Sequence, residues 1–284
     1  MAGKRTINIP LNRVEGDLDI SVEIEGGVVT DAWCSGTMYR GFEKILIGRG
    51  ALDGLVITPR ICGICSTAHL MCASLALDMI GEVTPPPDAV RVRNIALMTE
   101  KIQSDMRHGF LMFTADFVNP AYKECDLYEE AVERFEPFKG VAVIEVIKET
   151  KKILEIVAIL GGQWPHSSFM VPGGVASIPN QNDLVKCRLL LKQYRNWYEQ
   201  RILGCTIERW LEVKSVNDLD QWLETCDSHR ESHLGFYIRY ARLIGLDRIG
   251  MGHDTFISFG ALEFPVGTSL PMNGNQPRLV SAGI

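Results

Sequence analysis

Apolar and polar positions alternate with a strand period near the N-terminus and recur with a helix period after residue 40. Residues 18–25 alternate between apolar and polar side chains, and a Gly-Gly pair at 26–27 separates them from a β-branched segment at 28–30. This arrangement predicts an antiparallel hairpin. A further short strand is expected at 32–34.

After residue 40 the apolar side chains recur every three or four residues, as they do in amphipathic helices. The segments with this pattern are 67–80, 88–117, 141–160, 183–212 and 229–245. In the longest segment, the apolar stripe predicted to face the core consists of Ile95, Met98, Ile102, Met106, Phe110 and Phe113. Residues 161–182 are rich in Gly, Pro, Ser and Asn and predict a long loop, a kind of segment that is often functional.

These segments predict an α+β fold that is predominantly helical. In it, a small N-terminal antiparallel sheet packs on a bundle of long helices. We expect residues 1–60 to hold the sheet and several short helices. Residues 61–284 are expected to form the helical body of the same large domain.

Composition and charge exclude several classes of protein. The formal net charge of -6 argues against nucleic acid as a partner, because no basic stripe is available to neutralise phosphates. No apolar segment reaches the roughly 18 residues that a membrane-spanning helix needs, and residues 1–10 lack the apolar core of a signal peptide. We therefore expect a chain that is cytoplasmic or attached to a membrane through partners, while export on a partner's signal stays open.

Eight cysteines are spread along the chain without the framework spacing of disulfide-rich secreted domains. A chain of 284 residues buries enough surface to fold without such bonds, so reduced thiols are expected. The isolated cysteines interpreted as small core residues are Cys125, Cys187, Cys205 and Cys226.

One pair of cysteines stands out, because Cys62 and Cys65 form a C-x-x-C motif between Arg60 and His69. The chain has no second C-x-x-C motif that would complete a structural zinc site. A redox-active dithiol would need a preceding strand, and residues 51–59 are only weakly strand-like. Half of a nickel or iron site is a third reading, because thiolates suit such metals. Two buried thiols in a loop are the fourth, and spacing alone leaves all four open.

Several motifs around this pair occur in a fixed order along the chain. They are Arg-Val-Glu-Gly at 13–16, Arg-Gly-Phe-Glu at 40–43, Arg-x-Cys-Gly-x-Cys-x-x-x-His at 60–69, Gly-Gly-Gln-Trp-Pro-His at 161–166, Val-Pro-Gly-Gly at 171–174 and Gly-His-Asp-Thr-Phe-Ile-Ser-Phe-Gly at 252–260. Their order and spacing resemble the large, catalytic subunit of nickel–iron hydrogenases. The resemblance runs from about residue 5 to about residue 280, which makes it specific.

The resemblance implies a set of metal ligands. In the family, four cysteine thiolates from two C-x-x-C motifs hold nickel, and the second thiolate of each pair bridges to an iron that carries carbon monoxide and cyanide. By position, Cys62 corresponds to a terminal nickel ligand and Cys65 to a bridging ligand. His69 corresponds to a residue that hydrogen-bonds a cysteine sulfur and tunes the metal from outside its ligand shell. Arg60 opens the same motif and is placed with the catalytic residues.

Two carboxylates gain roles from the same resemblance. Glu15 corresponds to a proton-relay carboxylate near the terminal thiolates, where partial burial moves a pKa towards the working pH. Glu43 corresponds to a ligand of a magnesium (or iron) site near the active centre, since a hard cation prefers oxygen. Without the resemblance, Glu15 is also compatible with an exposed carboxylate at a strand entry. Glu43 is likewise compatible with a carboxylate favoured by a helix N-terminus.

One position departs from the family pattern. Many relatives have an aspartate four residues before a histidine of the long helix, where it helps to cover the metals. Counting back from His108, this position holds Ser104, with Asp105 beside it, so either Asp105 takes the role or the cover over the metals differs in this chain. The segment 99–108 is most similar to the uptake-type branch of the family.

The resemblance implies a hydrogenase that splits H2 heterolytically and passes electrons to iron–sulfur clusters of a small partner subunit. The alternative is a non-catalytic structural or quinone-site subunit of a related respiratory complex, although such a relative would need neither the Cys62–Cys65 pair nor Glu43. The family's second C-x-x-C motif, which also provides metal ligands, has no counterpart in these 284 residues. We therefore expect the N-terminal half of a large subunit, completed by a chain or segment that carries the second C-x-x-C motif.

Overall fold

The computed structural model describes residues 3–11, 13–14 and 16–249. The chain divides into two compact units, of which the first ends at Arg49 and the second begins at Gly50. The first unit holds the predicted sheet and the second holds the long helices, which confirms the expected α+β fold with a dominant helical part. The predicted division at residue 60 falls inside the second unit. The packing of the sheet on the helices stays a prediction.

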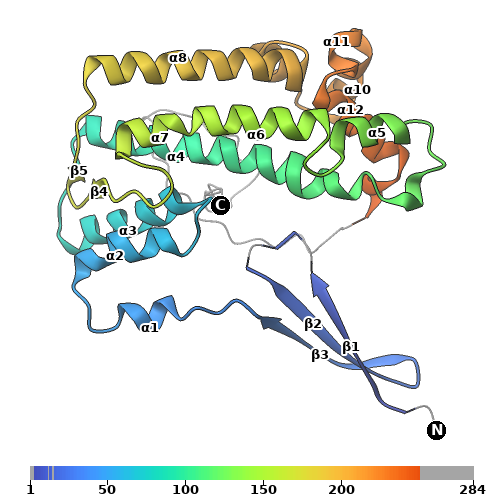
Figure 1. The fold of residues 1–284 in the computed structure, drawn as a ribbon, viewed down its shortest axis with the longest axis horizontal. Helices are drawn as coiled ribbons and strands as arrows, with labels where there is room; N and C mark the ends of the chain where they lie inside the picture. Colours follow the sequence, from blue (N-terminus) through green and yellow to red (C-terminus); the bar gives the residue numbers. More distant parts are fainter. Residues whose placement is uncertain (1–2, 12, 15, 250–284) are drawn as a thin grey trace. The chain divides into compact units, whose positions relative to one another are not determined.

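The sheet of the first unit has three antiparallel strands in the order β1-β2-β3 (Figure 1). Its elements are β1 (Arg5–Leu11), β2 (Leu18–Glu25) and β3 (Val28–Gly36), followed by the short helix α1 (Phe42–Leu46). The predicted hairpin is confirmed, because Gly26 and Gly27 join β2 to β3 with positive φ angles of 59° and 83°. The short strand expected at 32–34 is the continuation of β3. Strand β1 was not predicted, and it contains Pro10, which an edge strand tolerates.

The second unit begins with short helices that lead into two long ones (Figure 1). They are η1 (Ala51–Asp53), α2 (Gly54–Ile57), η2 (Thr58–Arg60), α3 (Ser66–Ile80) and α4 (Pro87–Arg107). Pro87 occupies the first position of α4, where a helix needs no N–H donor. The helix expected at 67–80 is confirmed as α3. The helix expected at 88–117 is α4 followed by a π-helical turn, η3 (His108–Phe113), and a 3₁₀ turn, η4 (Thr114–Asp116).

The remaining helices cover residues 120–248. In chain order they are η5 (Pro120–Tyr122), α5 (Tyr128–Phe135), α6 (Val141–Ile153), α7 (Glu155–Gly161), α8 (Gln181–Trp197), η6 (Tyr198–Leu203), α9 (Ile207–Trp210), α10 (Val216–Thr225), α11 (Asp227–Arg230), α12 (His233–Leu243) and η7 (Leu246–Arg248). Helix α8 begins at a capping box formed by Asn180 and Asp183. In the part of the chain that the structure describes, no helix has both the length and the apolar character needed to cross a bilayer.

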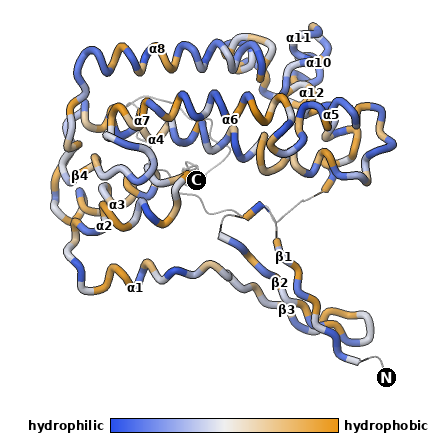
Figure 2. Tube along the Cα trace, viewed as in Figure 1, coloured by the Kyte–Doolittle hydropathy of each residue, from blue (hydrophilic) through white to orange (hydrophobic). Residues whose placement is uncertain are grey.

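Two hydrophobic clusters form the core of the helical unit. The larger one is rich in aromatic side chains, and Phe117 packs against Phe135 with ring centroids 5.5 Å apart. The smaller one joins α2, α3, α4, α7 and the 161–182 segment through Leu55, Leu70, Met71, Ala96, Leu97, Leu154, Val157, Phe169 and Met170. Figure 2 shows orange and blue positions alternating along α6 and α7, as amphipathic helices require. The smaller cluster supports the segment that carries the two cysteines.

Helix α4 buries a different stripe from the predicted one. Met106 and Phe110 are buried as expected, but Ile95 and Met98 are 43% and 45% exposed. The positions buried in their place include polar ones, among them Arg93, Thr99, Glu100 and Gln103. Arg93 and Glu100 tolerate burial because each has several hydrogen-bond partners on neighbouring segments. The spacing of apolar residues does not predict this stripe, because several of its buried residues are polar.

The predicted 161–182 loop contains a minimal hairpin. Strand β4 (Met170–Val171) pairs with β5 (Gly174–Val175). Pro172 and Gly173 form the turn between the two strands. Gly173 has a φ of 78°, which glycine adopts without strain in such a turn. The turn directs the Gly173 N–H to the Asp78 carboxylate of α3, 2.7 Å away, and this contact ties the loop to the helices.

The first residue of α12, His233, makes the helical unit sensitive to acid. Its Nδ1 lies 3.3 Å from the Arg134 guanidinium, which only donates, and its Nε2 lies 3.4 Å from Glu145 Oε2. The neutral ring with the proton on Nε2 satisfies both partners. Burial lowers the pKa of His233 to about 4, although the Glu145 charge opposes this shift.

We therefore expect the free energy of unfolding to fall as the pH is lowered from 6.5 to about 4, because the unfolded chain binds a proton that the folded chain excludes. The full effect is about 3 kcal/mol. Urea unfolding across this pH range, compared with an H233Q variant, measures it. An unchanged pH slope in H233Q would assign the acid sensitivity to other groups.

Candidate functional site

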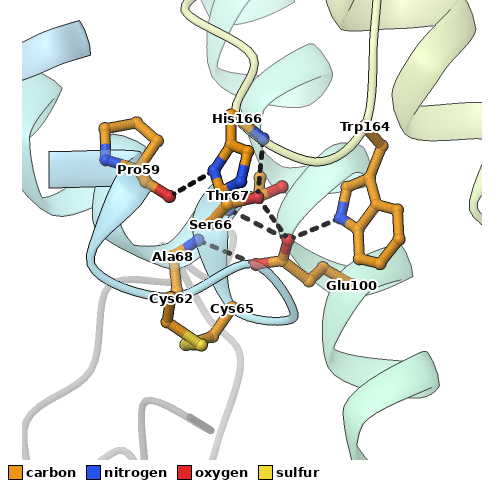
Figure 3. The surroundings of a disulfide bond; sticks show 9 residues. All are labelled: Pro59, Cys62, Cys65, Ser66, Thr67, Ala68, Glu100, Trp164 and His166. Atoms are coloured by element: carbon orange, nitrogen blue, oxygen red, sulfur yellow. Dashed lines mark hydrogen bonds between the residues drawn. A yellow bond between two sulfur atoms is a disulfide. The ribbon is translucent and has the colours of Figure 1, made fainter. Parts of the chain in front are cut away.

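The two cysteines of the C-x-x-C motif lie in the turn between η2 and α3 (Figure 3). Their Cα atoms are 5.5 Å apart and their sulfurs are joined in a disulfide. The prediction of reduced thiols is therefore wrong for this pair in the structure, because the turn brings the two Cα atoms within disulfide range. Cys65 is buried and stands at the N-cap position of α3, where its side chain makes no capping hydrogen bond. Once reduced, the same two sulfurs are close enough to bind one ion.

A buried glutamate of α4 fastens the start of α3. Glu100 is 2% exposed, and its carboxylate accepts hydrogen bonds from the Thr67 N–H and the Ala68 N–H, both at 2.9 Å. The indole N–H of Trp164 donates to the same carboxylate at 2.9 Å, and the Ser66 hydroxyl lies 3.4 Å away. Figure 3 shows the carboxylate between the helix start and the indole. Glu100 thus links α4, the turn that carries the cysteines and the 161–182 segment.

The loop that holds Trp164 also contacts the cysteine turn through His166. The ring Nδ1 of His166 lies 2.8 Å from the Pro59 carbonyl, which only accepts, so the proton is on Nδ1. The backbone N–H of His166 donates to the Ser66 hydroxyl at 3.2 Å, and its carbonyl accepts from Gln163 at 2.7 Å. The Gly-Gly-Gln-Trp-Pro-His motif therefore covers the cysteine turn.

His69 lies one turn into α3. Its backbone N–H donates to the Cys65 carbonyl at 3.3 Å. Burial lowers the pKa of the His69 ring, and the Glu100 charge partly opposes the shift. Among the described residues, no hydrogen bond joins the His69 ring to a cysteine sulfur. Its predicted role beside the sulfur thus stays a prediction, and the ring is neutral at neutral pH.

Of the other predicted residues, Arg60 lies in the same unit as the pair. Arg60 is exposed, and its guanidinium donates to the Val56 carbonyl. Glu43 lies in α1 of the first unit. Glu15 and the motif at 252–260 lie outside the described residues.

Asp105 lies on another side of α4 from Glu100. Five residues of an α-helix correspond to a rotation of about 140°. Its side chain is exposed, pairs with Lys101 at 3.1 Å and lines a pocket of about 370 Å³ with Tyr194 and Tyr198. The prediction that Asp105 joins the cysteine site is therefore not supported. Ser104, the residue at the family position, is only 40° from Glu100 by the same geometry.

The pair by itself is an incomplete metal site. Within residues 3–249, the described side chains contain no group of three or more His, Cys, Asp and Glu residues placed to hold a metal. Two soft sulfur donors fit a thiophilic metal as half of its ligands. Sequence reasoning missed Glu100 entirely, because a charged residue inside a helix is usually interpreted as solvent-exposed. It identified the motif at 161–166 but not the contacts of Trp164 and His166.

Comparisons with known proteins point to one family. The family model described as nickel-dependent hydrogenase matches residues 40–130. The periplasmic [NiFeSe] hydrogenase large subunit of Desulfomicrobium baculatum is 33% identical over 71% of this chain and 42% of its own length. The uptake hydrogenase large subunit of Rhodobacter capsulatus is 29% identical over 60% of this chain and 30% of its own length.

A solved structure agrees with these sequence comparisons. The reduced Ni-Fe-Se hydrogenase of D. vulgaris Hildenborough superimposes with a TM-score of 0.57 and 34% identity, over 70% of this chain and 43% of the other. This chain thus spans less than half the length of these relatives. Because the relatives include both periplasmic and uptake subunits, the uptake-type branch stays a prediction.

Proposed function

Because the chain belongs to the family of nickel-dependent hydrogenase large subunits, we propose that it supplies half of a nickel–iron centre that oxidises H2. The observation that carries the proposal is the convergence of the Cys62 and Cys65 sulfurs at the start of α3. This turn lies inside the segment that matches the family. As thiolates, the two sulfurs are suitable ligands for nickel and iron.

Cys62, Cys65 and His69 each have a proposed part in the reaction. The sulfurs of Cys62 and Cys65 would hold the centre, Cys62 as a ligand of nickel alone and Cys65 as a ligand shared by nickel and iron. The neutral His69 ring donates an N–H to a sulfur and so tunes its basicity. When bound, the centre, whose iron carries carbon monoxide and cyanide, supplies the Lewis-acid and redox chemistry for heterolytic cleavage of H2. The covered turn keeps both sulfurs in place and limits the access of water.

The carboxylates and Arg60 act around this turn. Glu15 accepts and passes on the proton released from H2, as a positioned general base does. Glu43 binds a magnesium or iron ion through hard oxygen atoms. Arg60, two residues before Cys62 in the chain, contributes positive charge to the segment that carries the thiolates. The role predicted for Asp105 in covering the metals stays a prediction, and its exposed side chain pairs with Lys101 and lines the pocket with Tyr194 and Tyr198.

Two kinds of partner complete the function. A small subunit with iron–sulfur clusters carries the electrons away, because a large subunit implies a small subunit as its partner. A second chain or segment with a C-x-x-C motif provides the other two thiolates, because one motif supplies only half of the four. The chain works in the cytoplasm or on a membrane through these partners, and export on a partner's signal stays open. The alternative of a non-catalytic subunit gains no support, since the relatives carry hydrogenase names.

Nickel analysis of the native assembly tests the proposal. The chain is purified with its associated chains, and nickel content and H2-dependent reduction of a viologen dye are measured. We expect near-stoichiometric nickel and dye reduction. A complete assembly without nickel would contradict the proposal.

A further inference from the structure

The start of α3 is capped in an unusual way. The first amides of an α-helix have no partner within the helix and need acceptors from elsewhere. A residue at the N-cap position commonly provides one with its own side chain. Cys65 occupies this position in α3 and provides none. The acceptor is the Glu100 carboxylate, which reaches the Thr67 and Ala68 amides from a different helix.

We propose that Glu100 is a positioning residue that caps α3 in place of Cys65 and thereby keeps the Cys65 sulfur available to the metal centre. A thiolate at a helix N-terminus is attracted to the free amides there. Because the Thr67 and Ala68 backbone N–H groups donate hydrogen bonds to the Glu100 carboxylate, they do not compete with a metal for the sulfur. This inference rests on the proposed function, and it adds a residue outside the family motifs described above.

The burial of Glu100 supports a positioning role. A buried carboxylate is costly unless several donors compensate the loss of water. Here two backbone amides and one indole N–H, all at 2.9 Å, meet its two oxygen atoms. Its charge also lies at the positive end of the α3 dipole. The same carboxylate holds Trp164 in the loop that covers the turn, so one group fixes both sides of the cysteine segment.

Glutamine at position 100 tests the capping without changing the volume. Its amide has one acceptor oxygen and an NH2 group, so at least one of the three donors then faces another donor. Outer residues that orient metal ligands typically change metal affinity by 10–100-fold when they are replaced. We expect nickel to leave the E100Q assembly for a chelator at least about tenfold faster than it leaves the wild type. Amide hydrogen exchange at Thr67 and Ala68 accelerates in the same variant.

Glu145 provides a matched control. It is a partly buried carboxylate on α6 that accepts from the Trp197 indole at 3.2 Å and pairs with Arg201 at 2.8 Å. The E145Q variant removes the same chemical group next to Val146 and Trp197 of the larger hydrophobic cluster. We expect it to lower stability without faster nickel loss, which separates positioning from general destabilisation.

The outcomes of this experiment are distinct. If wild type and E100Q lose nickel at equal rates, the capping inference is overturned and the proposed function stands. If E100Q and E145Q both lose nickel faster than the wild type and by the same factor, Glu100 acts only through stability and the inference is also overturned. If the wild-type assembly contains no nickel, the proposed function fails first and the inference fails with it. If E100Q does not accumulate, the E100D variant is measured instead. The shorter Asp side chain cannot reach both amides. An E100D assembly that retains nickel as well as the wild type would overturn the inference.

Discussion

Replacement of Cys65 with serine is expected to abolish nickel retention by the assembly and to lower H2-dependent dye reduction by at least about a thousandfold. A serine hydroxyl is a hard ligand that is protonated at neutral pH, so it does not replace a thiolate bridge between two metals. Nickel analysis and dye assays on the purified assembly measure both effects.

Cys72 offers the control for this prediction. It is an exposed free cysteine seven residues further along α3. The C72S variant is expected to keep nickel and activity at the wild-type level. A C65S assembly that retains nickel and activity would show that the centre does not depend on this pair.

Replacement of Asp78 with asparagine is expected to lower the free energy of unfolding by about 3–5 kcal/mol. Asp78 accepts from the Arg93 guanidinium at 2.6 Å and from the Gly173 N–H at 2.7 Å, and both charged side chains are buried. Burial opposes its ionisation, but the hydrogen bonds from Arg93 and Gly173 outweigh this effect and lower its pKa. The D78N variant leaves a buried guanidinium without its counter-charge, which is the costly outcome.

Urea unfolding of the chain measures this effect against an exposed pair. Asp88 pairs with Arg91 at 2.6 Å on the surface of α4, where water screens both charges. The D88N variant is expected to change stability by no more than about 0.5 kcal/mol. Equal losses in D78N and D88N would show that the buried pair does not hold the hairpin β4–β5 to the helices.

The elements that depend on local pattern were predictable from sequence. The alternation at 18–25 and the Gly-Gly pair after it predicted the hairpin, because both signals act over a few residues. The helix after Cys65 was predicted for the same reason. Strand β1 was not predicted, although Ile7, Ile9 and Leu11 alternate with other residues, because a proline inside the segment argues against a strand unless it lies at a sheet edge.

The contacts that build the cysteine site were beyond local pattern. Glu100 accepts a hydrogen bond from Thr67, which is 33 residues away in the sequence, and His166 donates one to Ser66, which is 100 residues away. No periodicity in the sequence pairs these positions, so the spacing of apolar residues predicts a different buried face of α4. For Asp105, the rotation of the helix places its side chain on another side of α4 from Glu100, which its position beside Ser104 in the sequence does not reveal.

The central claim is that Cys62 and Cys65 hold part of a nickel–iron centre, and infrared spectroscopy of the purified native assembly tests it most directly. Carbon monoxide and cyanide, when bound to iron, absorb in a region of the spectrum that is free of protein bands. The account predicts these bands in the wild-type assembly and their loss in the C65S assembly. Their absence from a complete wild-type assembly, or their persistence in C65S, would contradict it.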